Sequence, residues 1–240
     1  MWLVVRYQPT TLFSLRYSTA TTTGAKSLLV PSPYTVKMAL LVAAIRWQGV
    51  AFAKEVFPLL RDLSPMQICP SEYAVTNRCF LKYQKLREDK TAKSKRGADY
   101  EPPIGFQSTV GFREYVHLQG DLRIALPMQD EAQILDFLQL AVRVNYFGKR
   151  GSFVQYAGFE HIKVLPRIFS VSLLVAAGQS GILQPLDDMA PTLTFDQVDV
   201  TSEIRIGSGD RPSNPTLLPY RVNRSASTYS AYARLPGEHE

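Results

Sequence analysis

Residues 144–153, here called the glycine loop, constrain the fold most, because a strong helix pattern ends there and a strand pattern begins. Two aromatic residues, of which Tyr146 is the first, lead into it, and two glycines bracket its tip. Glycine lets a backbone bend sharply or approach another backbone closely, and Lys149 and Arg150 lie between the two glycines. Stacking rings beside cations are typical of a single-stranded nucleic acid site. The alternative is a helix C-cap followed by an exposed turn.

Positive charge is concentrated in one segment of this basic chain, which carries a net charge of +6. Residues 78–96 contain eight cations and two acids, so the remainder of the chain balances to zero. A local basic block on a neutral body indicates a polyanion partner, although a solubilising loop has the same composition. The cations assigned here to nucleic acid binding are Lys82, Lys85, Arg87, Lys93, Lys95 and Arg96.

A polar loop of residues 10–27, here called the Ser/Thr loop, follows a first predicted strand over Trp2 to Tyr7. The loop contains Arg16 and Lys26 and has a single glycine. We expect it to lie at the surface, where its hydroxyls and cations can contact a ligand.

The next segment predicts a helix with Ser32 as N-cap and proline at the first helical position. Its free backbone amides, beside the Ser/Thr loop and Lys37, predict a phosphate site. A capped core helix explains the same residues equally well. The predicted apolar stripe comprises Val36, Leu40, Ala43, Trp47 and Val50.

Two further helical segments are indicated, Phe52 to Leu63, interrupted by Pro58, and Asp130 to Val144. Strand patterns flank the basic segment, which predicts a long hairpin arm or an inserted segment that projects from the body. The order of elements suits an α+β fold, an open sheet with helices on one face in a ferredoxin-like or RNA-recognition-type layout. The chain after Ser152 reads as β-rich.

Several function classes are disfavoured by what the sequence contains. Cys69 and Cys79 match no zinc or redox spacing, so we expect reduced, buried thiols in a cytoplasmic protein. There is no P-loop, Rossmann fingerprint or paired acidic metal motif. The apolar stretch over residues 38–53 carries Arg46 and Gln48, so we expect no membrane span. We therefore expect no metal or nucleotide cofactor.

Metal-free RNA cleavage is the enzymatic alternative, since it needs only a base, an acid and a cation at the phosphate. His117 lies in a predicted strand and His161 follows the glycine loop, so either histidine paired with Lys149 would supply such a set. Strand histidines are more often structural. We expect binding without catalysis.

The chain resembles the Cas five family in the order of four features. These are the first strand, the Ser/Thr loop before Pro-Ser-Pro-Tyr-Thr-Val-Lys-Met, the basic arm, and Tyr-Phe-Gly-Lys-Arg-Gly-Ser-Phe. These RAMP subunits cap the crRNA handle in type I CRISPR (Cascade) effector complexes. The resemblance covers residues 1–160. It implies an RRM-like RAMP domain there, with a protruding basic thumb at about 78–112. A β-rich part, residues 161–240, would pack on the same body.

The resemblance also implies partners and roles. The subunit would grip the 5′ handle of the crRNA and join the backbone RAMP subunits to the large subunit, near the PAM of target DNA. The basic segment would be the thumb, Lys149 and Arg150 would match the family's Gly-basic-basic loop, and Tyr34 and Lys37 the start of its first helix. Two alternatives stay open: a metal-independent endoribonuclease that processes pre-crRNA, and a protein-interaction subunit whose basic arm contacts an acidic partner.

Overall fold

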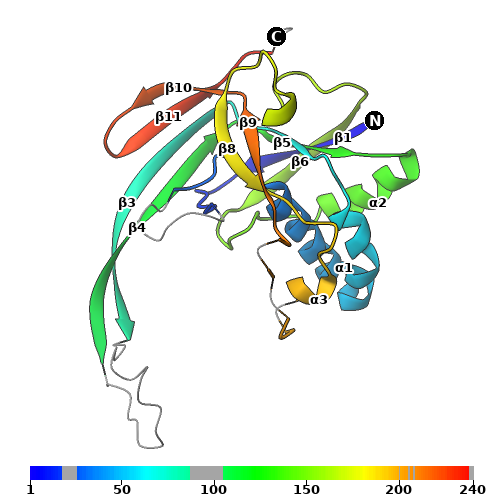
Figure 1. The fold of residues 1–240 in the computed structure, drawn as a ribbon, viewed down its shortest axis with the longest axis horizontal. Coiled ribbons are helices and arrows are strands. Elements are labelled where there is room, and N and C mark those ends of the chain that lie inside the picture. The colour runs from blue at the N-terminus through cyan, green and yellow to red at the C-terminus, as the bar shows by residue number, and fades with distance from the viewer. Residues whose placement is uncertain (18–25, 87–104, 200, 205, 208, 238–240) are drawn as a thin grey trace, which may run out of the picture.

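The structure is a computed structural model of the 240-residue chain. It describes residues 1–17, 26–86, 105–199, 201–204, 206–207 and 209–237. The fold is α+β, with mainly antiparallel strands arranged in three sheets and few helices (Figure 1).

The first sheet has the strand order β2-β5-β1-β6, and every neighbouring pair is antiparallel. Its strands are β1 (Trp2–Pro9), β2 (Gln67–Cys69), β5 (Leu122–Pro127) and β6 (Val154–Ile162). Side chains alternate across a strand, so Leu3, Val5 and Tyr7 of β1 enter the main core while Val4 enters a smaller cluster on the other face. Both faces of the predicted first strand are therefore buried.

Two helices pack together against this sheet, α1 (Pro33–Arg61) and α2 (Glu131–Ala141) (Figure 1). Both begin as predicted: Ser32 accepts a hydrogen bond from the Thr35 N–H, and Asp130 accepts one from the Gln133 N–H. The first half of α1 is buried, whereas its composition alone would suit a membrane span. Such burial is that of a core helix.

The second half of α1 departs from the prediction. Gly49 has a φ of 88°, which breaks the helical geometry and turns the following residues to a new face. Trp47 and Val50, expected in the buried stripe, are 38% and 47% exposed. Pro58 lies inside the helix and does not interrupt it.

The second sheet, in the order β10-β11-β3-β4, contains the predicted hairpin. Strands β3 (Tyr73–Leu86) and β4 (Phe106–Gln119) pair along their whole length. Strand β11 (Tyr229–Arg234), the partner of β10 (Tyr220–Ser225), pairs only with the first part of β3, up to Asn77. Beyond that point two strands extend alone from the body, and we call residues 78–86 and 106–114 the hairpin arm (Figure 1).

The predicted basic residues beyond the hairpin arm, namely Arg87, Lys93, Lys95 and Arg96, lie outside the described residues. The proposed thumb limits of 78–112 and the division at residue 160 stay predictions.

The third sheet joins β7 (Val171–Ser172), β9 (Ser213–Leu218) and β8 (Ile182–Asp187) in the order β7-β9-β8. Two short helices, η1 (Leu173–Val175) and α3 (Phe195–Val198), complete the fold. The segment that follows β8 lies against the start of α1, where Asp188 contacts Lys37. The last third of the chain thus covers part of the first.

Candidate nucleic-acid interface

The glycine loop forms a tight turn between α2 and β6. Tyr146 pairs with Phe153 as an isolated bridge, the Phe147 N–H donates to the Ser152 carbonyl at 3.1 Å, and the Ser152 N–H donates to the Lys149 carbonyl at 3.0 Å. These bonds close the backbone around a tip at which Lys149 and Arg150 are exposed. The two predicted cations are therefore available to an anion in solution.

A buried base holds this turn in place. Phe147 is fully buried, and its ring meets that of Tyr7 edge to face at 5.2 Å. The Tyr7 hydroxyl donates to the Ala141 carbonyl at 2.8 Å, at the end of α2. Burial raises the pKa of Tyr7 well above its ordinary value, so the hydroxyl remains a donor. The exposed tip thus stands on a rigid core.

Close approach explains the first glycine of the turn. A Cβ at Gly148 would lie 2.9 Å from Leu15 Cδ2 and 3.2 Å from Thr35 Cγ2, and its φ is +66°. The residue therefore needs both the left-handed backbone and the absence of a side chain. This contact joins the glycine loop to the Ser/Thr loop and to the first turn of α1.

One cation beside the glycine loop was missed by sequence reasoning. The Arg46 guanidinium lies 5.4 Å from the centre of the half-buried Tyr146 ring and donates to Asn145 Oδ1 at 3.3 Å. Arg46 belongs to α1, and no local pattern connects it with a loop so far along the chain. It adds a third cation to this surface.

The Ser/Thr loop connects the glycine loop to the hairpin arm. Thr11 Oγ1 donates to the Gly151 carbonyl at 2.6 Å, Phe13 pairs with Val116 of β4, and the Ser27 N–H donates to Glu114 Oε2 at 2.7 Å. Arg16 and Lys26 are exposed along this path. Three segments that sequence reasoning assigned to nucleic acid therefore meet through one continuous set of contacts.

The hairpin arm exposes both of its described candidate lysines. Lys82 lies opposite Val110 and Lys85 opposite Gln107, and because side chains alternate along a strand, the two point to opposite faces. The face of Lys82 also carries exposed apolar side chains, those of Phe80, Leu86, Phe106, Val110 and Phe112. The arm thus offers cations and aromatic surface together.

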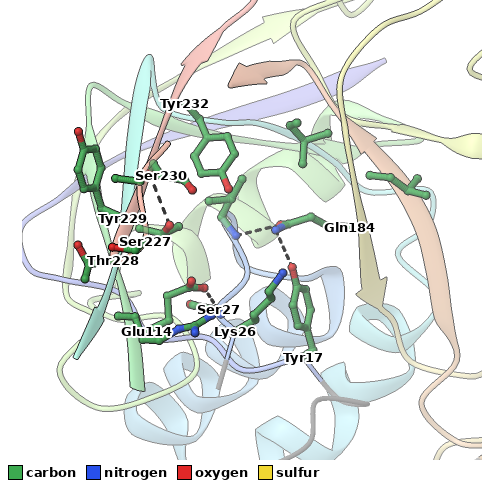
Figure 2. Close-up of a pocket in the computed structure, with 16 residues that line it drawn as sticks. Tyr17, Lys26, Ser27, Glu114, Gln184, Ser227, Thr228, Tyr229, Ser230 and Tyr232 are labelled. Carbon is green, nitrogen blue, oxygen red and sulfur yellow. Dashed lines mark hydrogen bonds between the residues drawn. The ribbon is translucent and has the colours of Figure 1, made fainter. Parts of the chain in front are cut away.

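A polar cavity of about 290 Å³ opens where the hairpin arm meets the body. Its walls come from the Ser/Thr loop, β3, β4, β8 and the turn between β10 and β11. Figure 2 shows Tyr17 and Gln184 on one side of it and Glu114, Ser227 and Ser230 on the other. Sequence reasoning had selected none of these five. Of the whole lining it had singled out Lys26 and, as the start of the basic segment, Arg78.

The start of α1 corrects the predicted phosphate site. Ser32 and Lys37 are fully buried, and the Lys37 ammonium lies 2.6 Å from Asp188 Oδ1 and donates to the Arg61 carbonyl at 2.9 Å. Burial lowers the pKa of Lys37, an effect that the Asp188 carboxylate opposes. The ammonium therefore acts inside the core and does not face a ligand.

Tyr34 is likewise covered. The Arg211 guanidinium lies 4.1 Å from the centre of the Tyr34 ring, and Arg211 is also paired with Asp187. Burial raises the pKa of Tyr34, which the Arg211 charge partly offsets. The predicted RNA contact at Tyr34 is not accessible in this arrangement.

The two candidate histidines lie in different sheets. His161 lies on β6, where it pairs with Leu3 of β1. It is seven residues beyond Val154, and therefore about 23 Å along the strand from the end of the glycine loop. The strand register therefore does not bring His161 beside Lys149. His117 is exposed on β4, opposite Val75, at the base of the hairpin.

Comparison with known proteins gives the class. No family model matches the chain. The CRISPR-associated protein Cas5 of Archaeoglobus fulgidus is 24% identical over 205 residues, which cover 82% of this chain and 84% of that protein. The chain is therefore similar to a CRISPR-associated protein over most of its length. The relative carries the name of the family that the motifs indicated, so the resemblance to the Cas five family is confirmed.

Two solved structures are also similar. One is the crystal structure of a CRISPR protein from Archaeoglobus fulgidus, with 12% identity, coverage of 98% of this chain and 99% of that one, and a TM-score of 0.45. The other is a chain of a CRISPR RNA-guided surveillance complex, with 13% identity, 91% coverage of each chain and a TM-score of 0.39.

Proposed function

We propose that this chain is a crRNA-binding subunit of a type I CRISPR, Cascade-like interference complex. It grips the 5′ handle of the crRNA and joins the backbone RAMP subunits to the large subunit, near the PAM of target DNA. The observation that carries the proposal is the meeting of the glycine loop, the Ser/Thr loop and the hairpin arm through direct contacts.

The topology supports a ferredoxin-like core for this role. The units β1-α1-β2 and β5-α2-β6 interleave in the sheet order β2-β5-β1-β6, which is the split β-α-β arrangement. The hairpin of β3 and β4 is inserted between the two units. The family resemblance implies a thumb at this position in the chain.

The chemistry of the surface suits a single-stranded RNA. Phosphates pair with cations and bases stack on rings, and the exposed cations include Arg16, Lys26, Lys82, Lys85, Lys149 and Arg150. Base pairing reads the guide in such complexes, so the protein need only hold the backbone and the handle.

We further propose binding without catalysis. A general base must reach the 2′-hydroxyl within hydrogen-bond distance while a cation meets the phosphate. His161 is separated from Lys149 by the length of β6. A His117→Ala variant tests the ribonuclease alternative: binding without cleavage by both forms supports our proposal, and cleavage that disappears in the variant contradicts it.

The direct experiment is co-purification of the chain with the products of neighbouring genes, followed by RNA extraction. We expect a uniform short RNA with a common 5′ sequence together with other subunits. Purification of the chain alone, without RNA, would contradict the proposal.

A protein partner for the basic arm is tested separately. Replacing Lys93, Lys95 and Arg96 by Gln should weaken RNA binding and flatten its salt dependence, because each phosphate contact contributes about 0.7 to the log–log slope on a single strand. An unchanged slope would remove these residues from the RNA site and favour an acidic protein partner.

A further inference from the structure

We infer that the cavity at the base of the hairpin arm holds one unpaired ribonucleotide whose base carries an amino group, namely adenine, cytosine or guanine in preference to uracil. The inference rests on the proposed function, because it takes the nucleotide to be part of the bound RNA. The similarity to known proteins extends over most of the chain and identifies no particular site. The inference concerns the side chains that line this one cavity.

The cavity brings together parts of the chain that share no local pattern. Lys26 comes from the Ser/Thr loop, Arg78 and Glu114 from opposite positions on β3 and β4, Gln184 from β8, and Tyr232 from β11. The Arg78 N–H also donates to the Thr228 carbonyl at 2.9 Å, which fixes the turn between β10 and β11 against the arm. The walls are therefore tied to one another.

Size and charge favour a single nucleotide. A volume of about 290 Å³ is near the lower end of the range of roughly 300–1,000 Å³ for small-ligand sites, and too small for a duplex. Two cations and one carboxylate line the cavity, so its balance is positive and suits a phosphate. Tyr17 and Tyr232 offer rings for stacking, and hydroxyls of the β10–β11 turn can contact a ribose.

The Gln184 amide positions Tyr17 and does not read the base. Gln184 is buried, its Oε1 accepts the Leu29 N–H at 2.9 Å, and its Nε2 donates to the Tyr17 hydroxyl oxygen at 3.0 Å. Because that oxygen accepts from Gln184, the Tyr17 O–H is available to donate to a ligand acceptor. Burial raises the pKa of Tyr17, an effect that the Gln184 hydrogen bond partly offsets, so the hydroxyl remains a donor at neutral pH.

The acceptor opposite is the Glu114 carboxylate (Figure 2). One of its oxygens accepts the Ser27 N–H, and an ionised carboxylate has about four acceptor positions. It can therefore accept from an amino group, as Glu does with the cytosine N4 amino group. Uracil presents carbonyl oxygens at its edge, with one ring N–H, and a carboxylate repels those oxygens.

The test measures binding of the full chain to eight-nucleotide oligo(A), oligo(C) and oligo(U) by fluorescence anisotropy at fixed salt. We expect oligo(A) and oligo(C) to bind at least about fivefold more tightly than oligo(U), the effect of one net hydrogen bond. In the Glu114→Gln variant this preference should disappear, since an amide can donate as well as accept, while the side-chain oxygen for the Ser27 N–H remains.

Two further variants separate base reading from phosphate binding. Arg78→Gln should weaken all three RNAs equally and lower the salt slope by about 0.7. Lys163→Gln, an exposed lysine just after β6 at the end far from the glycine loop, is the matched charge control and should change neither quantity.

The outcomes distinguish the two proposals. RNA binding that is equal for all three oligonucleotides, or a preference that survives Glu114→Gln, overturns this inference and leaves the proposed function intact. Absence of binding to every RNA overturns both. Free AMP is added in competition: displacement of oligo(A) by micromolar AMP would assign the cavity to a free nucleotide and overturn the RNA assignment.

Discussion

The start of α1 and the glycine loop look alike in sequence but differ in structure. Each combines a backbone device, Pro33 after an N-cap or paired glycines, with a neighbouring cation. At the start of α1 the cation, Lys37, is fully buried and paired with Asp188. In the glycine loop Lys149 and Arg150 are exposed at the tip.

The difference shows that residue type and spacing do not reveal whether a cation already has a partner. Asp188 lies far along the chain from Lys37, in the segment after β8 that folds over the start of the helix. A helix N-terminus attracts an anion, but here the core closes it. Only the glycine loop keeps its charges for a ligand.

The largest effect should come from Lys37→Met. Removing one partner of a buried pair leaves the Asp188 carboxylate, which is only 12% exposed, without its countercharge, and such a loss costs about 3–5 kcal/mol. We expect urea unfolding to show this loss while the folded fraction binds RNA normally. Lys54→Met, which breaks the exposed 3.7 Å pair with Asp196, is the control and should cost at most about 1 kcal/mol. If the Lys37→Met variant lost RNA affinity but kept full stability, Lys37 would belong to the RNA interface.

The double variant Lys149→Gln, Arg150→Gln should give the opposite result. Both cations are exposed, so unfolding should be unchanged. Two lost phosphate contacts should lower the slope of log affinity against log salt by about 1.4 and weaken RNA binding about tenfold or more near 0.1 M salt. Anisotropy titrations at several salt concentrations measure both quantities, and an unaltered slope would exclude the glycine loop from phosphate binding.

Gly148→Ala tests whether the tip depends on its close packing. The new Cβ would meet Leu15 Cδ2 at 2.9 Å with φ at +66°, so we expect a loss of about 2 kcal/mol in thermal unfolding and weaker RNA binding. Gly151→Ala also has a positive φ but meets nothing within 4 Å. It should cost less, and equal costs would show that the contact with Leu15 is unimportant.

Tyr7→Phe examines the buried base of the glycine loop and should have the smallest effect. It keeps the ring against Phe147 but removes the 2.8 Å hydrogen bond to Ala141, which should cost about 1 kcal/mol. A pH series of unfolding measurements gives a second readout. Burial raises the pKa of Tyr7, so the unfolded chain loses this proton near pH 10 while the folded chain keeps it.

Stability due to this group is therefore complete below about pH 10 and declines as the pH rises further. The wild-type chain should lose stability more steeply than Tyr7→Phe between about pH 10 and 11. Burial also raises the pKa of Tyr220, which is present in both proteins and therefore contributes equally to both curves. Parallel curves would contradict the predicted role of the Tyr7 proton.

Local chemistry made several elements predictable. The starts of α1 and α2 follow from Ser32 and Asp130, whose side chains bond to backbone three residues ahead. The hairpin was indicated because two alternating patterns flank a polar, charged segment, and the turn at residues 146–153 because glycine permits positive φ. Each of these depends on neighbours within a few residues.

The cavity and the fate of each cation depend on contacts between distant segments. Gly49 redirects the end of α1, the segment after β8 buries Lys37, and β11 joins β3 to close one wall around Arg78. An amphipathic pattern indicates which face of a helix or strand is buried, but it does not identify the segment that packs against that face. The order of the residues therefore determined the helix starts, the hairpin and the local basic charge. Packing between remote strands decided which charges remain exposed, because burial and ion pairing are properties of the assembled core.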